Sequence, residues 1–174
     1  PVYIENQTID EIIDFTSFLE THLISEGIYQ VNIKSGITFK KCVFNKPVSA
    51  FKKLENGNSV LTAFQANVSF IDCVFLDDVN FRGSSISGRV DFTGSKFNKS
   101  TNFEELKCHE NAFFNHCVFE APLRFQNAFF YQKANFMSAE FHDTVSFQNN
   151  LFNSELQFSA AKFYKYTDFT LIDS

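Results

Sequence analysis

Phenylalanine recurs every eleven residues through most of this chain. The first series keeps this spacing without exception: Phe70, Phe81, Phe92, Phe103, Phe114, Phe125, Phe136, Phe147, Phe158 and Phe169. A second series lies five residues after the first: Phe75, Ile86, Phe97, Cys108, Phe119, Phe130, Phe141, Phe152 and Phe163. A fixed period is typical of repeat proteins, in which each unit buries its apolar side chain only by stacking on its neighbours. We expect the phenylalanines of both series to form the structural core.

The residues just before each ring also follow a pattern. Small or apolar residues stand two positions before the first series: Val68, Val79, Val90, Thr101, Ala112, Leu123, Ala134, Val145, Leu156 and Thr167. Mostly small residues precede the second series in the same way: Cys73, Ser84, Ser95, Cys117, Ala128, Ala139 and Ala161. In most units a polar residue separates the two inward positions, which indicates a very short β-strand followed by a turn.

The length of one coil follows from which positions resemble one another. At a step of twenty-two residues, one set of rings is uniform: Phe75, Phe97, Phe119, Phe141 and Phe163. The set between them is mixed: Ile86, Cys108, Phe130 and Phe152. Because stacking pairs residues one full coil apart, the sequence predicts a β-solenoid of about 22 residues per coil with four faces. The alternating gaps of five and six place an extra residue at two of the four corners.

Five triplets resemble the repeat core of pentapeptide-repeat proteins. They are "VNF" at 79–81, "VDF" at 90–92, "TNF" at 101–103, "ANF" at 134–136 and "TDF" at 167–169. The resemblance covers residues 28–174 and implies an all-β, right-handed quadrilateral β-helix with a ring at the centre of each face. The chain departs from the family pattern at alternate faces, where the spacing is longer and Asp or Asn does not precede the ring.

Residues 1–27 are predicted to form a capping segment made of a strand and a short α-helix. Thr8 and Glu11 have capping-box spacing, and Gly27 is a helix stop, so we expect a helix at about 9–24. Its apolar stripe would comprise Ile9, Ile12, Ile13, Thr16, Leu19 and Leu23. A membrane-binding helix is the weaker alternative, because acidic residues flank the stripe.

The solenoid is expected over 28–174, with an irregular loop near 50–58. The register slips at "FKKLENGN", 51–58, where Asn56-Gly57 predicts a turn. Such an interruption is either a recognition element or a tolerated surface insertion.

Charge and hydropathy favour no nucleic acid or membrane partner. The net charge is −5 with both signs interspersed, so no basic footprint for nucleic acid is present. No apolar run approaches the length of a membrane span. We expect a cytoplasmic protein, unless processing before Pro1 removed a targeting segment.

The sequence offers no catalytic or metal site and implies no cofactor. Three cysteines take small buried positions and Cys108 takes a ring position, so we expect free thiols rather than disulfides. "CHENAFFNHC", 108–117, does not have zinc-finger spacing, and strand alternation turns His109 and His116 away from the thiols. No motif gathers a nucleophile, an acid and a base, and we expect no enzyme.

The expected function is a non-catalytic module, a rigid scaffold whose flat faces bind another protein. Apolar residues in outward positions form the candidate interaction patch, Phe113, Phe129, Tyr131 and Leu151. The alternative for each is packing across a corner of the coil. A second function, implied by the family resemblance, is DNA mimicry directed at a type II topoisomerase, but no acidic column runs along the predicted coil. The last residues, "FTLIDS" at 169–174, carry neither Pro nor Lys to protect the end of the coil. We therefore expect either that the native chain continues past Ser174 or that two copies form a homodimer through the C-terminal coil.

Overall fold

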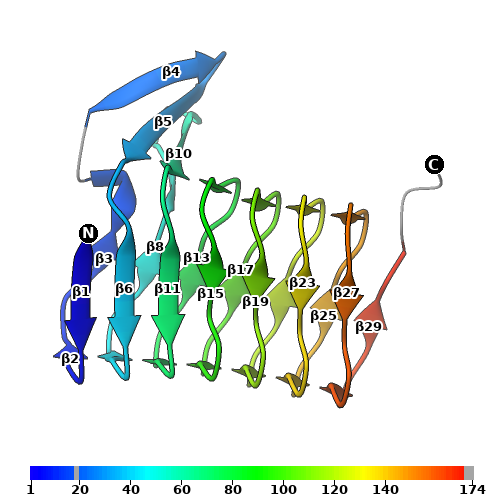
Figure 1. Ribbon diagram of the computed structural model, residues 1–174. Coiled ribbons are helices and arrows are strands. Elements are labelled where there is room, and N and C mark those ends of the chain that lie inside the picture. Colours follow the sequence, from blue (N-terminus) through cyan, green and yellow to red (C-terminus); the bar gives the residue numbers. More distant parts are fainter. Residues whose placement is uncertain (18–19, 171–174) are drawn as a thin grey trace.

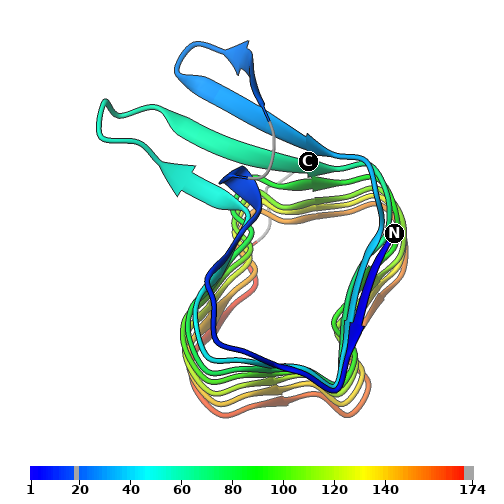
Figure 2. The same ribbon diagram turned by 90° about the vertical axis from the view of Figure 1, so that its left-hand side faces the viewer.

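Most of the strands in the molecule contain only two residues. The computed structural model describes residues 1–17 and 20–170, and in it the chain winds into a β-helix of stacked coils (Figure 1). Viewed along its axis, the β-helix is a quadrilateral with one sheet on each side (Figure 2). We call the sheets A, B, C and D in the order in which the chain visits them.

Sheets A, B and C each contain seven parallel strands. Sheet A comprises β1 (Val2–Glu5), β6 (Ile37–Lys40), β11 (Val68–Ile71), β15 (Val90–Asp91), β19 (Ala112–Phe113), β23 (Ala134–Asn135) and β27 (Leu156–Gln157). Sheet B comprises β2 (Thr8–Ile9), β7 (Val43–Phe44), β12 (Val74–Phe75), β16 (Lys96–Phe97), β20 (Val118–Phe119), β24 (Glu140–Phe141) and β28 (Lys162–Phe163). Sheet C comprises β3 (Ile13–Asp14), β8 (Val48–Ser49), β13 (Val79–Asn80), β17 (Thr101–Asn102), β21 (Leu123–Arg124), β25 (Val145–Ser146) and β29 (Thr167–Asp168).

Sheet D is larger because two antiparallel strands join it. Its main path comprises β4 (Thr21–Ser25), β5 (Ile28–Ile33), β10 (Ser59–Phe64), β14 (Ser85–Ile86), β18 (Lys107–Cys108), β22 (Phe129–Phe130) and β26 (Leu151–Phe152). β4 runs antiparallel to β5, and β9 (Phe51–Lys53) runs antiparallel to β10. A short 3-10 helix, η1 (Phe15–Ser17), precedes β4.

Strand pairing confirms the predicted coil length. From β11 onward each residue pairs with the residue twenty-two positions later, as in Val68 with Val90 and Phe75 with Phe97. Ile37 pairs with Val68, thirty-one positions later, because this coil contains nine additional residues. Of the irregular loop expected near 50–58, residues 51–53 form strand β9, and residues 54–58 form the tip of its hairpin with β10.

The interior is filled by columns of stacked rings. On sheet B, the ring centroids of Phe97 and Phe119 are 4.6 Å apart and those of Phe119 and Phe141 are 5.4 Å apart, and the ring planes are nearly parallel. These spacings are close to the distance between neighbouring strands, so one pairing register aligns both backbones and rings. Rings of adjacent columns meet edge to face, as Phe114 and Phe125 do at 5.3 Å.

Most of the predicted core rings are buried, and the exceptions lie at the C-terminal end. Phe152 and Phe158 are partly buried, whereas Phe163 and Phe169 are exposed. The last coil has no following coil to cover these rings within the described residues.

The Asp or Asn before the ring has a structural task on sheets A and C. Its side-chain oxygen accepts a hydrogen bond from the N–H two residues later, as Asn102 does from Glu104 at 2.9 Å and Asn135 does from Met137 at 2.9 Å. On sheet B, the N–H of the residue that follows the ring instead donates to a backbone carbonyl of the preceding coil, as the Asn98 N–H does to the Phe75 carbonyl. This difference explains why only alternate faces carry Asp or Asn.

The small inward positions that precede the rings of sheet B also bond to the preceding coil. Ser95 Oγ donates to the Phe70 carbonyl at 2.6 Å, and Cys117 Sγ lies 3.0 Å from the Phe92 carbonyl. Cysteine and serine therefore fit these positions as small side chains with a hydrogen-bond donor.

The predicted α-helix at 9–24 is wrong, and residues 1–27 are not a separate cap. β1, β2 and β3 instead form three sides of a first coil, in which Ile4, Ile9 and Ile13 lie opposite Phe39, Phe44 and Val48. Strand pairing both covers these side chains and satisfies the backbone of the coil beneath, which a helix lying across the end would not do. Ile12, placed in the apolar stripe of the helix, is exposed, and Leu19 lies outside the described residues. The strand expected in the first seven residues is β1.

Because the rings are packed in columns, we expect substitutions of interior rings to lower the free energy of unfolding far more than substitutions of surface rings. Phe119 is 1% exposed, so Phe119→Ala should lower the free energy of unfolding by about 3 to 5 kcal/mol, through lost burial and the cavity left behind. Tyr131 is 39% exposed, and Tyr131→Ala should cost less than about 1 kcal/mol. Urea unfolding followed by circular dichroism measures both. Equal midpoints for the two variants would contradict the assigned packing.

Candidate binding surfaces

An apolar patch lies on the outward side of sheet D. Phe129 of β22 and Leu151 of β26 are direct neighbours in the strand register, one coil apart. Leu151 is 46% exposed and Phe129 is partly exposed. The sequence analysis placed these two residues in one column, and the structure confirms that arrangement.

Tyr131 extends this patch at the corner between sheets D and A. Its ring stacks on His109 of the preceding coil, with centroids 4.8 Å apart and planes at 7°. His109 Nε2 is in turn 3.0 Å from Ser85 Oγ. A polar and aromatic row therefore borders the apolar pair, and Tyr131 is 39% exposed. We call Phe129, Tyr131 and Leu151 the sheet D patch.

Phe113 does not belong to the sheet D patch. It lies on sheet A, where the Arg89 guanidinium carbon sits 4.3 Å from its ring centroid. Arg89 also pairs with Asp91 at 2.5 Å, and Asp91 is only 4% exposed because Arg89 and Phe113 cover it. The Phe113 ring thus supports a cation–π contact above an ion pair whose carboxylate is buried. The 22-residue period places Asp91 beside Phe113, but the position of the Arg89 guanidinium over the ring depends on its side-chain conformation, which the pattern does not predict.

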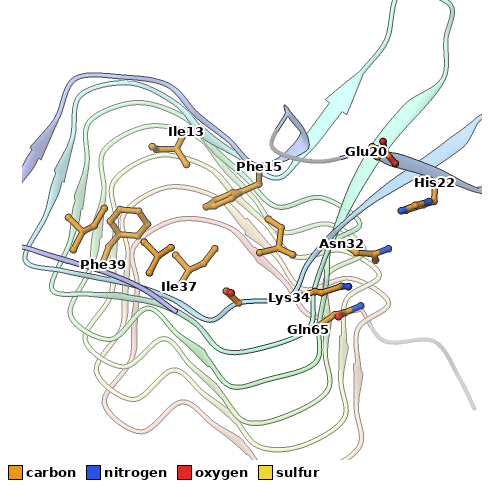
Figure 3. Close-up of a pocket in the computed structure, with 13 residues that line it drawn as sticks. Ile13, Phe15, Glu20, His22, Asn32, Lys34, Ile37, Phe39 and Gln65 are labelled. Atoms are coloured by element: carbon orange, nitrogen blue, oxygen red, sulfur yellow. The ribbon is translucent and has the colours of Figure 1, made fainter.

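A cleft of about 950 Å³ opens at the N-terminal end of the β-helix (Figure 3). Ile4, Ile13, Ile33, Ile37 and Phe39 contribute to its apolar lining, and Glu20, His22, Lys34 and Gln65 to its polar rim. It lies at the start of the β-helix, where β5 forms the fourth side of the first coil and β4 folds back antiparallel to β5 outside that coil. Sequence reasoning missed the cleft because it placed a helix over this end.

On sheet B, opposite sheet D, charged side chains form ion pairs. Lys96 Nζ lies 2.7 Å from the Glu120 carboxylate, and Lys162 Nζ lies 2.7 Å from the Glu140 carboxylate. The His142 ring lies between these two carboxylates, 3.9 Å from that of Glu120 and 3.2 Å from that of Glu140. The pKa of Glu140 is below its ordinary value, chiefly through the hydrogen bond from Lys162 and then that of His142. The pKa of Glu120 is lowered as well, first by Lys96.

The cysteines are buried inside the coil and carry no disulfide. Burial raises the pKa of Cys73 to about 12 and raises those of Cys108 and Cys117 as well, so these thiols stay protonated. His109 and His116 are exposed on the other side of the backbone, as strand alternation predicted.

Residues 1–17 and 20–170 contain no group of three or more His, Cys, Asp or Glu side chains that could hold a metal ion. Within the same ranges, no helix has the length and apolar character to cross a membrane.

One comparison with known proteins gives a match. The family model described as pentapeptide repeats (9 copies) matches residues 62–106, in the middle of the β-helix. Strand register and ring stacking continue unchanged from this segment to the C-terminal coils. No curated protein and no solved structure matches the chain.

The lowered pKa of Glu140 predicts an effect of removing Lys162. A carboxyl whose pKa is lowered on folding contributes stability that is complete above its unfolded pKa and is lost as the pH falls through its folded pKa. Lys162→Met should therefore raise the pKa of Glu140 toward its ordinary value and shrink the loss of stability between neutral and acidic pH. NMR titration of the side-chain carboxyl carbon measures this pKa. Lys46→Met, at the far end of the same side, is the matched control, and an unmoved Glu140 in Lys162→Met would contradict the assignment.

Proposed function

Because the chain is a pentapeptide-repeat protein, we propose that it acts as a non-catalytic scaffold that binds another protein through the outward side of sheet D. The sheet D patch carries this proposal. Leu151, Tyr131 and Phe129 stand together where outward positions of the same sheet hold Ser85 and Lys107 nearer the N-terminus. Clustered apolar side chains on a flat surface are typical of protein–protein contact sites.

The rigidity of the β-helix supports a scaffold role. Stacked rings fill the interior, and each backbone strand is paired on both sides except at the ends of the sheets. A partner would therefore meet a preformed surface and would not have to order it, which reduces the entropic cost of binding.

The charge arrangement favours a scaffold over DNA mimicry. A mimic of duplex DNA needs negative charges in regular, unpaired rows. Here Lys165 Nζ lies 3.0 Å from Asp143, and Arg82 lies 3.7 Å from Glu104 and 3.1 Å from Glu105, so basic side chains neutralise the acidic ones along the coil.

We also propose a homodimer through the C-terminal coil. Phe163, Tyr164, Tyr166 and Phe169 are all exposed there, and a second copy related by a two-fold axis would cover these rings. The sequence prediction of this dimer rested on residues 169–174, of which 171–174 lie outside the described residues.

Photo-crosslinking tests the proposed scaffold function. With benzoylphenylalanine in place of Leu151, the protein produced in its native cells should give a discrete crosslinked product with a second protein. Val118, which faces outward on the opposite sheet B, is the matched control position. Adding Phe129→Glu should remove the product, because a carboxylate would be buried against the partner. Equal products from positions 151 and 118 would contradict a binding surface on sheet D.

Light scattering tests the proposed dimer. The mass of the wild-type protein should approach twice that of one chain as its concentration rises, and Phe169→Lys should return it to the monomer. The same lysine placed at Leu76, an exposed apolar residue far from the C-terminal coil, should leave the dimer intact. A wild-type monomer at every concentration would refute the dimer.

A further inference from the structure

β4 is the terminal strand of sheet D and projects beyond the coil (Figures 1 and 2). Within residues 1–17 and 20–170 it pairs with β5 alone, through Thr21 with Val31, His22 with Gln30 and Leu23 with Tyr29. In an antiparallel strand, alternate residues direct their N–H and C=O groups to opposite sides, so part of the β4 backbone faces away from β5. Among the strands that end the four sheets, β4 is the longest in the described part of the chain, with five residues.

Both faces of β4 are open to solvent, and its edge is unprotected. All five residues are exposed, including Leu23 at 64% and Ile24 at 51%. Proteins usually protect such an edge with lysine, proline or a charged side chain pointing inward. β4 contains none of these, whereas β9, at the other margin of the same projection, carries Lys52 and Lys53.

An irregularity in the pairing presents one apolar side chain. The register between β4 and β5 shifts between Leu23 and Ser25, so Ile24 has no partner in β5. Bulges of this kind re-aim a side chain and occur beside binding sites. Ile24 is thus available to a molecule that lies along the outer edge.

The charges at the two ends of β4 indicate which strand would fit there. Glu20 comes immediately before the strand and Glu26 immediately after it, and both are exposed. A second copy of β4, paired antiparallel so that all five residues match, would centre on Leu23 and place Glu20 opposite Glu26 at both ends. Like charges directly opposite each other destabilise a strand pair. Self-pairing is therefore disfavoured, and a strand with basic residues at both ends is favoured.

We propose that β4 accepts an extended segment of a partner protein as an additional strand, and that this segment carries a Lys or Arg at each end of an alternating apolar stretch. Backbone hydrogen bonds to the β4 edge would hold the segment, as in other cases of strand addition. Leu23 and Ile24 would contact its apolar side chains. Glu20 and Glu26 would set its register by pairing with the two basic residues. This edge is separate from the sheet D patch, so the inference does not depend on the proposed function.

A designed peptide tests this directly. The probe is Lys-Thr-Val-Thr-Val-Thr-Lys, acetylated, amidated and fluorescently labelled, and its anisotropy is followed as the protein is added. We expect saturable binding that is at least about tenfold tighter than that of the same peptide with Glu in place of both Lys residues. The double variant Glu20→Lys, Glu26→Lys should reverse this preference and bind the Glu-flanked peptide. Such a reversal cannot result from misfolding.

Backbone methylation separates strand addition from simple charge attraction. Two further probes carry N-methyl groups on the odd or on the even residues, so each removes the donors along one edge of the peptide. Strand addition predicts that one of them loses binding and the other retains it. Equal binding by both methylated peptides, or equal binding of the Lys- and Glu-flanked peptides, would overturn the proposal. So would a wild-type dimer that Ile24→Lys converts to a monomer, because the occupant of the edge would then be a second copy.

Discussion

Parallel pairing of each coil with the next is the constraint on which the rest of this structure depends. The strand spacing brings equivalent side chains to about 4.8 Å, close to the distance at which flat rings stack face to face. Phe75, Phe97 and Phe119 follow one another at 4.8 and 4.6 Å because their strands do. Any residue placed in an inward position must therefore suit the residues above and below it. An insertion is accommodated only if the chain leaves the coil and returns in register, as the β9–β10 hairpin does.

This constraint confines function to the outside and the ends of the β-helix. The inward positions are occupied by packed side chains, and small polar ones before the rings of sheet B bond to the preceding coil, as Ser95 does. Many outward polar groups also serve the fold. Asn102 and Asn135 accept backbone hydrogen bonds, and Glu140 is held by Lys162 and His142. What remains for recognition is the minority of outward side chains with no such task, chiefly the sheet D patch and the strand that ends the same sheet.

Sheet D differs from the other three because the chain departs from the regular coil there twice. β4 folds back on β5, which forms the fourth side of the first coil, and β9 and β10 extend the second coil as a hairpin (Figure 2). The first departure is accompanied by an open cleft at the N-terminal end and, in the described part of the chain, by an unpaired strand edge. The apolar pair Phe129 and Leu151 lies on the same sheet, nearer the C-terminus. Both proposed contact regions thus occur on one side of the molecule.

The sequence by itself determined the coil length, the four faces and the inward rings, because these depend on a period that every coil repeats. It also placed Phe129 beside Leu151, since that relation is one step of the same period. It failed at the N-terminus, where Ile9 and Ile13 are four residues apart: this spacing fits a helical stripe, but it also separates the inward positions of consecutive faces, as Phe44 and Val48 show. Only the tertiary structure decided between a helix and a coil, because β1, β2 and β3 pair with the strands of the next coil, β6, β7 and β8. Tertiary contacts also decided that the Arg89 guanidinium lies over Phe113 and that β4 has an open outer edge in the described part of the chain, since the first depends on side-chain conformation and the second on a segment outside the repeat.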